Sequence, residues 1–327
     1  MSRKTELQAI ERLAKKRQLW LERTALALNI AQDDAAILLT TQRQPSFRIN
    51  DLKVRSKQQG KEVLKTLLGG GWQGEALGPG FTIDSGYEAV RDSHVVTEGL
   101  VYIQNAASWL PVVVLDPQPG EAILDVCAAP GGKASHIAAI TKNQAELWLN
   151  DNSRIRLHKL RANLERLGVR VAGLTLYDAT QLVRKYAQEQ PRVFDKILLD
   201  APCSGDGLMR LNNDKDFATW SVAHIKRLQQ LQKKLITQAW QLLKPGGTLV
   251  YSTCTMAPEE NEAVIDYLLR KNNDVQVKTI DIKLPNQVKS VLIWHGKEFD
   301  QSLHKSLRLA PSPHIEAFYV CSLLKLR

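Results

Sequence analysis

The chain has 327 residues, 44% of them apolar and 24% charged, and its 44 Lys and Arg against 34 Asp and Glu give a formal net charge of +10. These values are typical of a globular protein with a main core and a smaller second unit. They exclude a membrane-spanning helix, because no stretch approaches the ~20 uncharged apolar residues that such a helix needs.

The first 20 residues are charged throughout and lack the apolar core of a secretion signal, so we expect a cytoplasmic protein. The basic balance favours a polyanionic partner such as nucleic acid, although charge alone does not specify one. The four cysteines include no Cys-x-x-Cys pair, and no histidine cluster has zinc spacing. We therefore expect neither a metal site nor a disulfide framework.

The first third of the chain predicts a small α+β unit. Apolar residues at helical spacing predict helices within residues 5–40. A short strand at 45–50, a helix at 55–68 that ends at "GGG", and two short strands at 72–77 and 80–86 follow. We place the domain boundary at residue 97, which gives an N-terminal domain of residues 1–97 and a second domain of residues 98–327.

The second domain alternates buried-type strands with amphipathic helices. The expected strands are 122–126, 145–150, 172–177, 194–200, 247–253 and 315–325. The expected helices are 133–141, 153–168, 221–243 and 260–271. This alternation predicts a doubly wound α/β sheet, in which ligands bind beyond the carboxyl ends of the strands. Cys203 and Cys254 each follow such a strand.

A glycine-rich turn, "LDVCAAPGGKAS", follows the first of these strands and opens a helix. A phosphate-binding P-loop is excluded, because Cys127 and Ala134 stand at its required glycine and hydroxyl positions, and the Gly-x-Gly-x-x-Gly dinucleotide motif is absent. Gly131 and Gly132 allow the backbone to approach a ligand closely. An S-adenosylmethionine site fits this turn, and a connecting turn without a ligand is the alternative.

Acidic residues follow three successive strands. Asp151 could accept hydrogen bonds from ribose hydroxyls, or it could cap a helix as Asn152 and Ser153 could. Asp178 follows the third strand, where the adenine edge of a nucleotide would lie, and Asp200 ends the fourth. Together with the glycine-rich turn, these acids outline a single cleft.

Three motifs carry a family resemblance. "DVCAAPGGK", "LLDAPCSGDG" and "YSTCTMAPEENE", in this order, resemble those of the RNA 5-methylcytosine methyltransferases of the bacterial Sun and eukaryotic nucleolar-protein family. The similarity runs from about Gly99 to the C-terminus, and "SFRIN" is similar to a strand of the family's small RNA-recognition-like domain. The pair Gln104–Asn105 and the segment "MRLNNDKD" depart from the family pattern, and we expect no additional C-terminal RNA-binding domain.

The resemblance implies a Rossmann-like class I methyltransferase sheet, S-adenosylmethionine as cofactor and RNA as partner, either rRNA or tRNA. It implies that the cofactor is bound by Cys127, Ala128, Ala129, Pro130, Gly131, Gly132, Lys133, Asp151, Asp178 and Asp200. It also implies that Cys254 is the nucleophile, that Cys203 assists product release, and that Lys133 and Asp200 line the target base. We read Cys321 as structural, and we expect a monomer.

The implied chemistry explains why a cysteine is needed. Carbon 5 of cytosine is a poor nucleophile, and a thiolate that adds to carbon 6 makes carbon 5 enamine-like. Asp200 would have to be protonated to hydrogen-bond ring nitrogen 3, so we expect a raised pKa for it in the bound state, and Lys133 would favour the thiolate. DNA cytosine methyltransferases use a Pro-Cys at the position of Cys203, so spacing alone leaves either cysteine as the attacker.

Two other functions are open from the sequence. An amine-directed RNA methyltransferase would use "DAPC" as its base-binding loop but needs no nucleophilic thiol. A non-catalytic RNA-binding assembly factor would keep the fold, although Cys254, Cys203, Lys133 and Asp200 are all present. Whatever the function, we expect the N-terminal unit, with its basic stretch around Arg12, Lys15, Lys16 and Arg17, to contact RNA phosphates. A basic surface that only keeps the protein soluble is the alternative.

Overall fold

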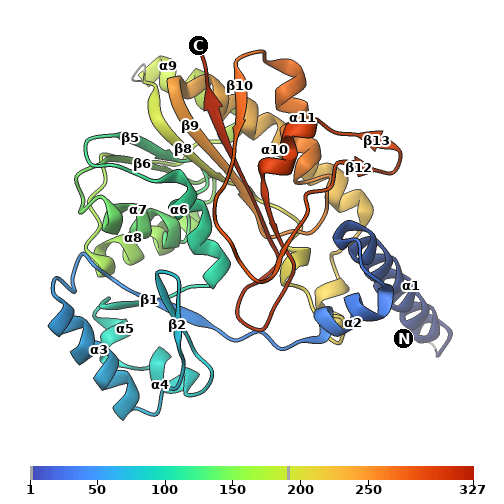
Figure 1. The fold of residues 1–327 in the computed structure, drawn as a ribbon, viewed down its shortest axis with the longest axis horizontal. Helices are drawn as coiled ribbons and strands as arrows, with labels where there is room; N and C mark the ends of the chain where they lie inside the picture. Colours follow the sequence, from blue (N-terminus) through green and yellow to red (C-terminus); the bar gives the residue numbers. More distant parts are fainter. Residues whose placement is uncertain (1–2, 190–191) are drawn as a thin grey trace.

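The computed structural model describes residues 3–189 and 192–327 and has three parts: a helical pair at the N-terminus, a small α+β unit and a large α/β domain (Figure 1). The helical pair and the small unit lie at opposite ends of the large domain's lower edge in this view. The expected fold class, a doubly wound α/β sheet with a small N-terminal α+β unit, is confirmed.

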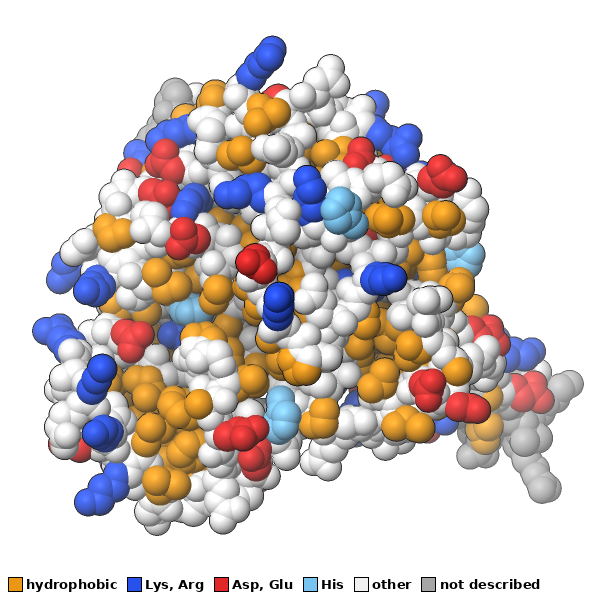
Figure 2. Space-filling model, in the orientation of Figure 1, with side chains coloured by type: hydrophobic (Ala, Val, Ile, Leu, Met, Phe, Trp, Pro, Cys, Tyr) orange, Lys and Arg blue, Asp and Glu red, His pale blue; other side chains and the backbone are white. Residues whose placement is uncertain are grey.

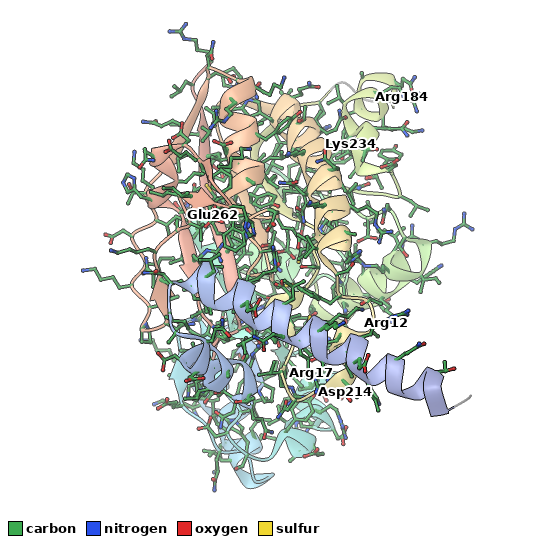
Figure 3. The ribbon with its side chains drawn as sticks, turned by 90° about the vertical axis from the view of Figure 1, so that its right-hand side faces the viewer. Arg12, Arg17, Arg184, Asp214, Lys234 and Glu262 are labelled. Atoms are coloured by element: carbon green, nitrogen blue, oxygen red, sulfur yellow. The ribbon has the colours of Figure 1, made fainter. Side chains whose placement is uncertain are left out.

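The two N-terminal helices are α1 (Arg3–Leu28) and α2 (Gln32–Thr40), as the spacing within residues 5–40 predicts. Both helices pack on the large domain. Trp20 of α1 meets the ring of Phe217 edge-on at 5.3 Å between centroids, and Leu39 of α2 is buried in the same apolar cluster. Among the described residues, none of the small unit belongs to this cluster. Figure 3 shows Arg17 of α1 beside Asp214 of the large domain, with which it forms an ion pair.

The small unit is built on a four-stranded antiparallel sheet in the order β2-β3-β1-β4. Its elements are β1 (Ser46–Ile49), α3 (Lys57–Gly69), β2 (Ala76–Leu77), β3 (Gly80–Thr82), α4 (Tyr87–Arg91), α5 (His94–Thr97) and β4 (Val101–Ile103). Phe47, Trp72 and Phe81 form its aromatic core. Because β4 pairs with β1, the small sheet extends just past residue 97; the boundary at 97 as a division between domains stays a prediction.

The large sheet has nine strands, with the path β11-β14-β15-β9-β8-β5-β6-β7 and β10 paired to β15. They are β5 (Ala122–Asp125), β6 (Glu146–Asn150), β7 (Gly173–Thr175), β8 (Phe194–Asp200), β9 (Leu243–Thr253), β10 (Val275–Lys278), β11 (Gln287–Val288), β14 (Leu307–Leu309) and β15 (Phe318–Lys325). Along the path β7-β6-β5-β8-β9, adjacent strands are parallel. The chain adds β6 and β7 on one side of β5 and then β8 and β9 on the other, so the order of the strands reverses between β5 and β8. That switch point is where a doubly wound sheet binds its ligand.

Helices cover both faces of the large sheet. One apolar layer takes side chains from α9 (Leu182–Glu189), α10 (Val222–Leu242) and α11 (Glu262–Lys271). The other takes them from α6 (Leu110–Leu115), α7 (Gly132–Ile140) and α8 (Arg154–Leu167). The remaining elements are β12 (Ile293–Trp294), β13 (Lys297–Glu298) and the 3₁₀ turns Ala106–Trp109, Ala179–Gln181, Asp206–Leu208, Asp214–Phe217 and Gln301–Lys305.

Buried polar contacts fasten the small unit to α7. Arg48 of β1 donates hydrogen bonds to the Gly132 carbonyl at 3.2 Å and to Gln104 Oε1 at 3.1 Å. Its burial lowers the pKa of this guanidinium to about 10. The contact fixes β4 and the segment after it against the start of α7, which is the turn that the motif "CAAPGGK" forms.

Candidate active site

A cavity of about 270 Å³ opens at the switch point, between the turn after β5 and the segment after β4. Its lining comprises Tyr102, Ile103, Gln104, Asn105, Ser108, Asp125, Cys127, Ala128, Ala129, Pro130, Gly132, Lys133 and Asp200. Gly131 adopts φ +107°, which favours glycine, and a Cβ on Gly132 would stand 3.0 Å from Gln104 Nε2. The two glycines therefore permit the tight turn and the close approach of the opposite wall.

Asp125, the last residue of β5, lies at the base of this cavity and is only 1% exposed. Its Oδ1 accepts the Cys127 backbone N–H at 3.3 Å, and its Oδ2 has no partner among the described residues. Burial, and then the neighbouring Asp200 carboxylate, raise the pKa of Asp125 to about 7. A buried acceptor without a partner fits a ligand that brings a cationic donor.

Two other residues expected to bind the cofactor, Asp151 and Asp178, lie outside the lining of the cavity. Asp151 is buried beside it, where Oδ2 accepts the Ala129 N–H at 3.3 Å and also pairs with Arg156 at 3.3 Å. Asp178 caps a 3₁₀ turn: its carboxylate accepts the Thr180 N–H at 2.9 Å, a hydrogen bond that lowers its pKa. Neither side chain lines the cavity, so their contact with a ligand stays a prediction.

A second cavity of about 100 Å³ adjoins the first. It is lined by Asn105, Ala107, Ser108, Lys133, Asp200, Ala201, Leu208, Cys254, Glu316 and Phe318. The two cavities share Lys133 and Asp200, which form an ion pair at 2.7 Å between Nζ and Oδ2. Burial acts to lower the pKa of Lys133, but the Asp200 carboxylate outweighs it and the pKa is raised. The ammonium therefore stays charged where the two cavities meet.

The two candidate reactive thiols lie side by side, with 3.4 Å between Cys203 Sγ and Cys254 Sγ. Cys254 lines the second cavity, whereas Cys203 lines neither. The hydrogen bond to Cys254, together with burial, raises the pKa of the Cys203 thiol well above its usual range. Cys203 is thus a protonated neighbour of the thiol that faces the cavity. Cys321 is fully buried on β15, consistent with the structural role expected from the sequence.

Two buried carboxylates hold the loops that carry these thiols. Glu260 accepts the Ser204 N–H at 2.9 Å and Gln232 Nε2 at 2.8 Å, and burial raises its pKa to about 7. Asp206 accepts the Thr255 hydroxyl at 2.6 Å and the Met256 N–H at 2.7 Å. Each carboxylate thereby ties the loop after β8 to the loop after β9, so the spacing between the thiols is fixed by groups that do not react.

A buried ion pair also stabilises the loop after β9. Arg308 of β14 donates two hydrogen bonds to Glu262, at 3.0 and 2.9 Å, and a third to the Met256 carbonyl at 2.9 Å. Arg308 is 1% exposed and Glu262 is not exposed, and Glu262 is labelled in Figure 3. Asn261 adds a hydrogen bond to the Thr255 carbonyl at 2.9 Å. The motif "STCTMAPEENE" is therefore one hydrogen-bonded unit around Cys254.

Glu316, which was not expected from the sequence, lines the second cavity beside the reactive groups. Its carboxylate is 6% exposed and accepts the Ala107 N–H at 3.3 Å, and burial raises its pKa. Asp125 was not expected either. Nothing local in the sequence singles out Glu316, whereas Asp125 ends the strand before the glycine-rich turn and could have been found by that position.

Comparison with known proteins identifies the family. Residues 112–324 match the family model described as 16S rRNA methyltransferase RsmB/F. The chain belongs to this family. The family expected from the sequence is thereby confirmed, and the chain is an enzyme of the methyltransferase class.

Individual relatives agree. The chain is 40% identical over 291 residues to a tRNA (cytosine(49)-C(5))-methyltransferase of Pyrococcus abyssi, covering 87% of this chain and 89% of that one. It is 36% identical to the ribosomal RNA small subunit methyltransferase F of Vibrio parahaemolyticus and 34% identical to the 25S rRNA (cytosine-C(5))-methyltransferase nop2 of Schizosaccharomyces pombe. These matches cover 79% and 87% of this chain but only 54% and 46% of the relatives, so the chain spans about half their length.

Among solved structures, a methyltransferase homolog protein from Pyrococcus horikoshii has a TM-score of 0.74 and 31% identity, and the match covers 94% of this chain and 99% of that one. Within the described residues, no helix is long and apolar enough to cross a membrane. Nor does that part of the chain group three or more His, Cys, Asp or Glu side chains so that they could hold a metal ion.

Proposed function

We propose that the protein methylates carbon 5 of a cytosine in RNA, with S-adenosylmethionine as methyl donor and Cys254 as nucleophile. The observation that carries this proposal is the thiol of Cys254 in a small cavity that shares Lys133 and Asp200 with a larger one. One cavity suits a cofactor and the other suits a flipped base, and the ion pair stands between them. For this protein, a cytoplasmic location and a monomeric state remain predictions.

The larger cavity fits the methyl donor in charge and shape. The free Oδ2 of Asp125 is placed to accept the ammonium group of its methionine part, and the small residues Ala128, Ala129 and Gly132 leave room against Gln104. When bound, S-adenosylmethionine supplies an electrophilic methyl group on a sulfonium. Asp151, close behind Ala129, is the residue that we expect to meet the ribose hydroxyls.

In the smaller cavity, Cys254 adds through sulfur to carbon 6 of cytosine and makes carbon 5 nucleophilic. Asp200 and Lys133 are positioned to hold the polar edge of the ring while carbon 5 takes the methyl group. A base then removes the carbon 5 proton, and the Cys254 thiolate leaves by elimination. Overall, one hydrogen of cytosine is replaced by the methyl group, and one proton and the demethylated thioether form of the donor are released.

Cys203 is the residue that we expect to support the release step. Its Sγ is 3.4 Å from Cys254 Sγ, close enough to exchange a proton with the departing thiolate or to relay one from carbon 5. Its absence from the lining of the smaller cavity favours Cys254 as attacker. The reverse assignment would require Cys203 to turn into that cavity.

RNA as substrate is supported by the family and by the names of its relatives, which act on tRNA or rRNA cytosines. An amine-directed methyltransferase would leave two neighbouring thiols at the cavity without a role, and an assembly factor would not need the ion pair between the cavities. The geometry therefore favours carbon-5 chemistry over both alternatives.

The test is methyl transfer from labelled S-adenosylmethionine to two unmodified RNA pools, one of tRNA and one of small-subunit rRNA, followed by mass spectrometry of the nucleosides. We expect 5-methylcytidine in at least one pool. Methyl groups found only on an exocyclic amine or a ribose would support the amine-directed alternative or another class. No transfer to either pool, with intact cofactor binding, would favour the assembly factor.

A further inference from the structure

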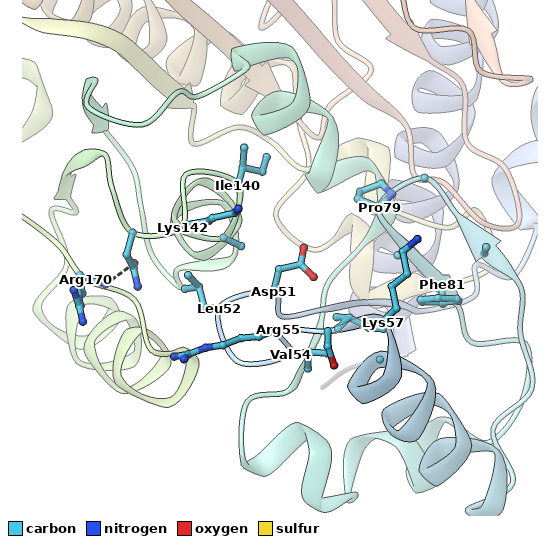
Figure 4. A pocket seen from close by; sticks show the side chains of 18 residues that line it. Asp51, Leu52, Val54, Arg55, Lys57, Pro79, Phe81, Ile140, Lys142 and Arg170 are labelled. Atoms are coloured by element: carbon cyan, nitrogen blue, oxygen red, sulfur yellow. Dashed lines mark hydrogen bonds between the residues drawn. The ribbon is translucent and has the colours of Figure 1, made fainter.

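A groove of about 960 Å³, larger than either active-site cavity, lies between the small unit and the far end of α7 (Figure 4). On one side it is lined by the segment from Asp51 to Lys57 and by the β2–β3 hairpin. On the other it is lined by the end of α7, the turn at Lys142 and Arg170. No residue of the active-site cavities contributes to it.

The rim of this groove is strongly basic. Arg55, Lys57, Lys142 and Arg170 stand around it against the single carboxylate of Asp51, so four positive charges and one negative leave a net of +3. All four cations are exposed, and none takes part in an ion pair within the described chain. Four uncompensated cations around one groove attract a polyanion.

The rim is held in place by hydrogen bonds between asparagine side chains and the backbone. Asn143 accepts the Arg170 N–H at 2.9 Å, the contact drawn in Figure 4, and donates to the Gly168 carbonyl at 2.9 Å. Asn50 donates to the carbonyls of Gly99 and Leu167 at 2.8 and 2.9 Å, which fastens the small unit to the end of α8. The groove is therefore preformed between two fixed walls.

Apolar side chains also line the groove. Phe81, half-buried, lines the groove with Pro79 and Ile140, and one face of its ring stacks on Phe47 at 5.4 Å between centroids. In Figure 2 hydrophobic side chains gather over the small unit at lower left, and Lys and Arg side chains border them on the left edge. An aromatic ring inside a cationic rim is how proteins hold single-stranded nucleic acid, with bases stacked and phosphates paired.

We propose that this groove binds a single-stranded stretch of the substrate RNA that flanks the target nucleotide. The inference rests on the proposed function, which supplies RNA as the ligand. β4 borders the cofactor cavity, and residues of β1, β2 and β3 line the groove, so the small sheet joins the two sites. RNA that crosses this sheet could reach both.

The test uses a fluorescein-labelled oligouridine of about 12 nucleotides, within the range of single-strand site sizes. It contains no cytosine, so no methylation or covalent attachment can contribute to binding. Anisotropy titrations compare the wild type with Arg55→Glu/Arg170→Glu and with the control Lys271→Glu/Lys278→Glu. The control reverses two exposed cations on α11 and β10, at the opposite end of the molecule in Figure 1.

We expect the groove variant to bind at least about tenfold more weakly and its log–log salt slope to fall by about 1.4, since each lost phosphate contact contributes about 0.7. The control should stay within about twofold of wild type, because long-range charge alone is largely screened. Phe81→Leu, which keeps an apolar side chain but removes the ring, should weaken binding about fivefold or more through loss of stacking. Thermal melts verify that each variant is folded.

Equal losses in the groove and control variants would overturn the inference, and so would tighter groove-dependent binding of a duplex of the same length. Failure of the proposed function is read separately, as absence of 5-methylcytidine in the nucleoside assay. Oligouridine binding that depends on the groove would survive that failure. If the wild type methylates RNA but the groove variant binds oligouridine as tightly as the wild type, only the groove inference is refuted.

Discussion

Charged side chains are buried in the two loops around Cys203 and Cys254, but they are exposed in the groove beside α7. In the loops, Glu260, Asp206 and the pair Arg308–Glu262 are buried and fully engaged with neighbours. In the groove, the cations are exposed and have no ion-pair partner among the described residues. The first arrangement fixes geometry, and the second leaves charge available to a ligand.

This contrast has a mechanistic reason. Bond formation at carbon 6 tolerates little displacement of the thiol, so the cost of burying polar groups is offset by preorganisation. Phosphate recognition instead depends on summed charge at a distance and tolerates motion. Substitutions in the loops should therefore act through stability and turnover, whereas those in the groove should act through affinity and salt dependence.

The largest expected effect is on stability, from Arg308→Met. It leaves the buried Glu262 carboxylate without its cation, which should lower the free energy of unfolding by about 3–5 kcal/mol. Urea unfolding followed by tryptophan fluorescence measures it. Arg308→Met/Glu262→Gln should recover more than half of the loss. Arg91→Met, which breaks the exposed pair with Asp92, is the matched control and should change nothing measurable. If Arg308→Met lowers the free energy of unfolding by no more than Arg91→Met does, the contrast between buried and exposed charges is wrong.

Removing the predicted ribose acceptor should cost cofactor affinity. Asp151→Ala should weaken S-adenosylmethionine binding by about tenfold or more, since a hydrogen bond to a charged group contributes about 1.5–3 kcal/mol. Asp178→Ala should weaken it by less than about threefold, because that carboxylate is exposed and engaged with its own 3₁₀ turn, whereas Asp151 is buried. Isothermal titration calorimetry compares them. Unchanged binding in Asp151→Ala would remove this assignment, and an equal loss in both variants would place Asp178 against the cofactor.

Cofactor affinity should rise with pH through the titration of Asp125. With its pKa raised to about 7, the carboxyl is mostly protonated at pH 6 and cannot pair with an ammonium; above pH 7 it can. The affinity should therefore increase by about tenfold or slightly less between pH 6 and pH 7.5, where the ligand's own amino group is still largely charged. Asp125→Asn should bind more weakly with a flat profile. A flat wild-type profile would show that Asp125 does not meet the cofactor's cation.

The smallest effect is expected at the N-terminal helix. Of the four basic residues in the stretch from Arg12 to Arg17, Lys16 donates to the Phe217 carbonyl at 2.8 Å and Arg17 pairs with Asp214, whereas Arg12 and Lys15 are exposed. Arg12→Glu/Lys15→Glu should weaken RNA binding by about threefold, with a modest fall in salt slope. Anisotropy at several salt concentrations measures it. A loss greater than that of the groove variant would make α1 the main RNA contact.

Much of the architecture could be predicted from the sequence, because the buried parallel strands are apolar runs and the helices between them have clear apolar faces. The motifs also predicted that residues 127–133, Asp200 and Cys254 share one edge of the sheet, and all of these except Gly131 line one of the two adjoining cavities. The pairing of β4 with β1 could not be foreseen, since antiparallel register depends on contacts across 50 residues of chain.

Other features escaped because they depend on three-dimensional surroundings. Glu316 becomes a candidate only through its burial in the second cavity, which raises its pKa. The groove joins residues from segments 51–57, 76–81, 139–143 and 170, none of which carries a motif. The charge density from Arg12 to Arg17 was visible in the sequence, but two of the four cations, Lys16 and Arg17, contact the large domain.

The most direct test of the account is a covalent trap. Purified Cys254→Ala and Cys203→Ala proteins are each incubated with S-adenosylmethionine and the RNA pool that the wild type methylates, then separated by denaturing gel electrophoresis. If Cys254 attacks carbon 6, Cys254→Ala forms no adduct and no 5-methylcytidine. Cys203→Ala should accumulate a slower protein band that disappears with ribonuclease, because the methylated adduct forms but is not released. A band in Cys254→Ala with none in Cys203→Ala would reverse the two roles, and full methylation by both variants would contradict covalent catalysis in this protein.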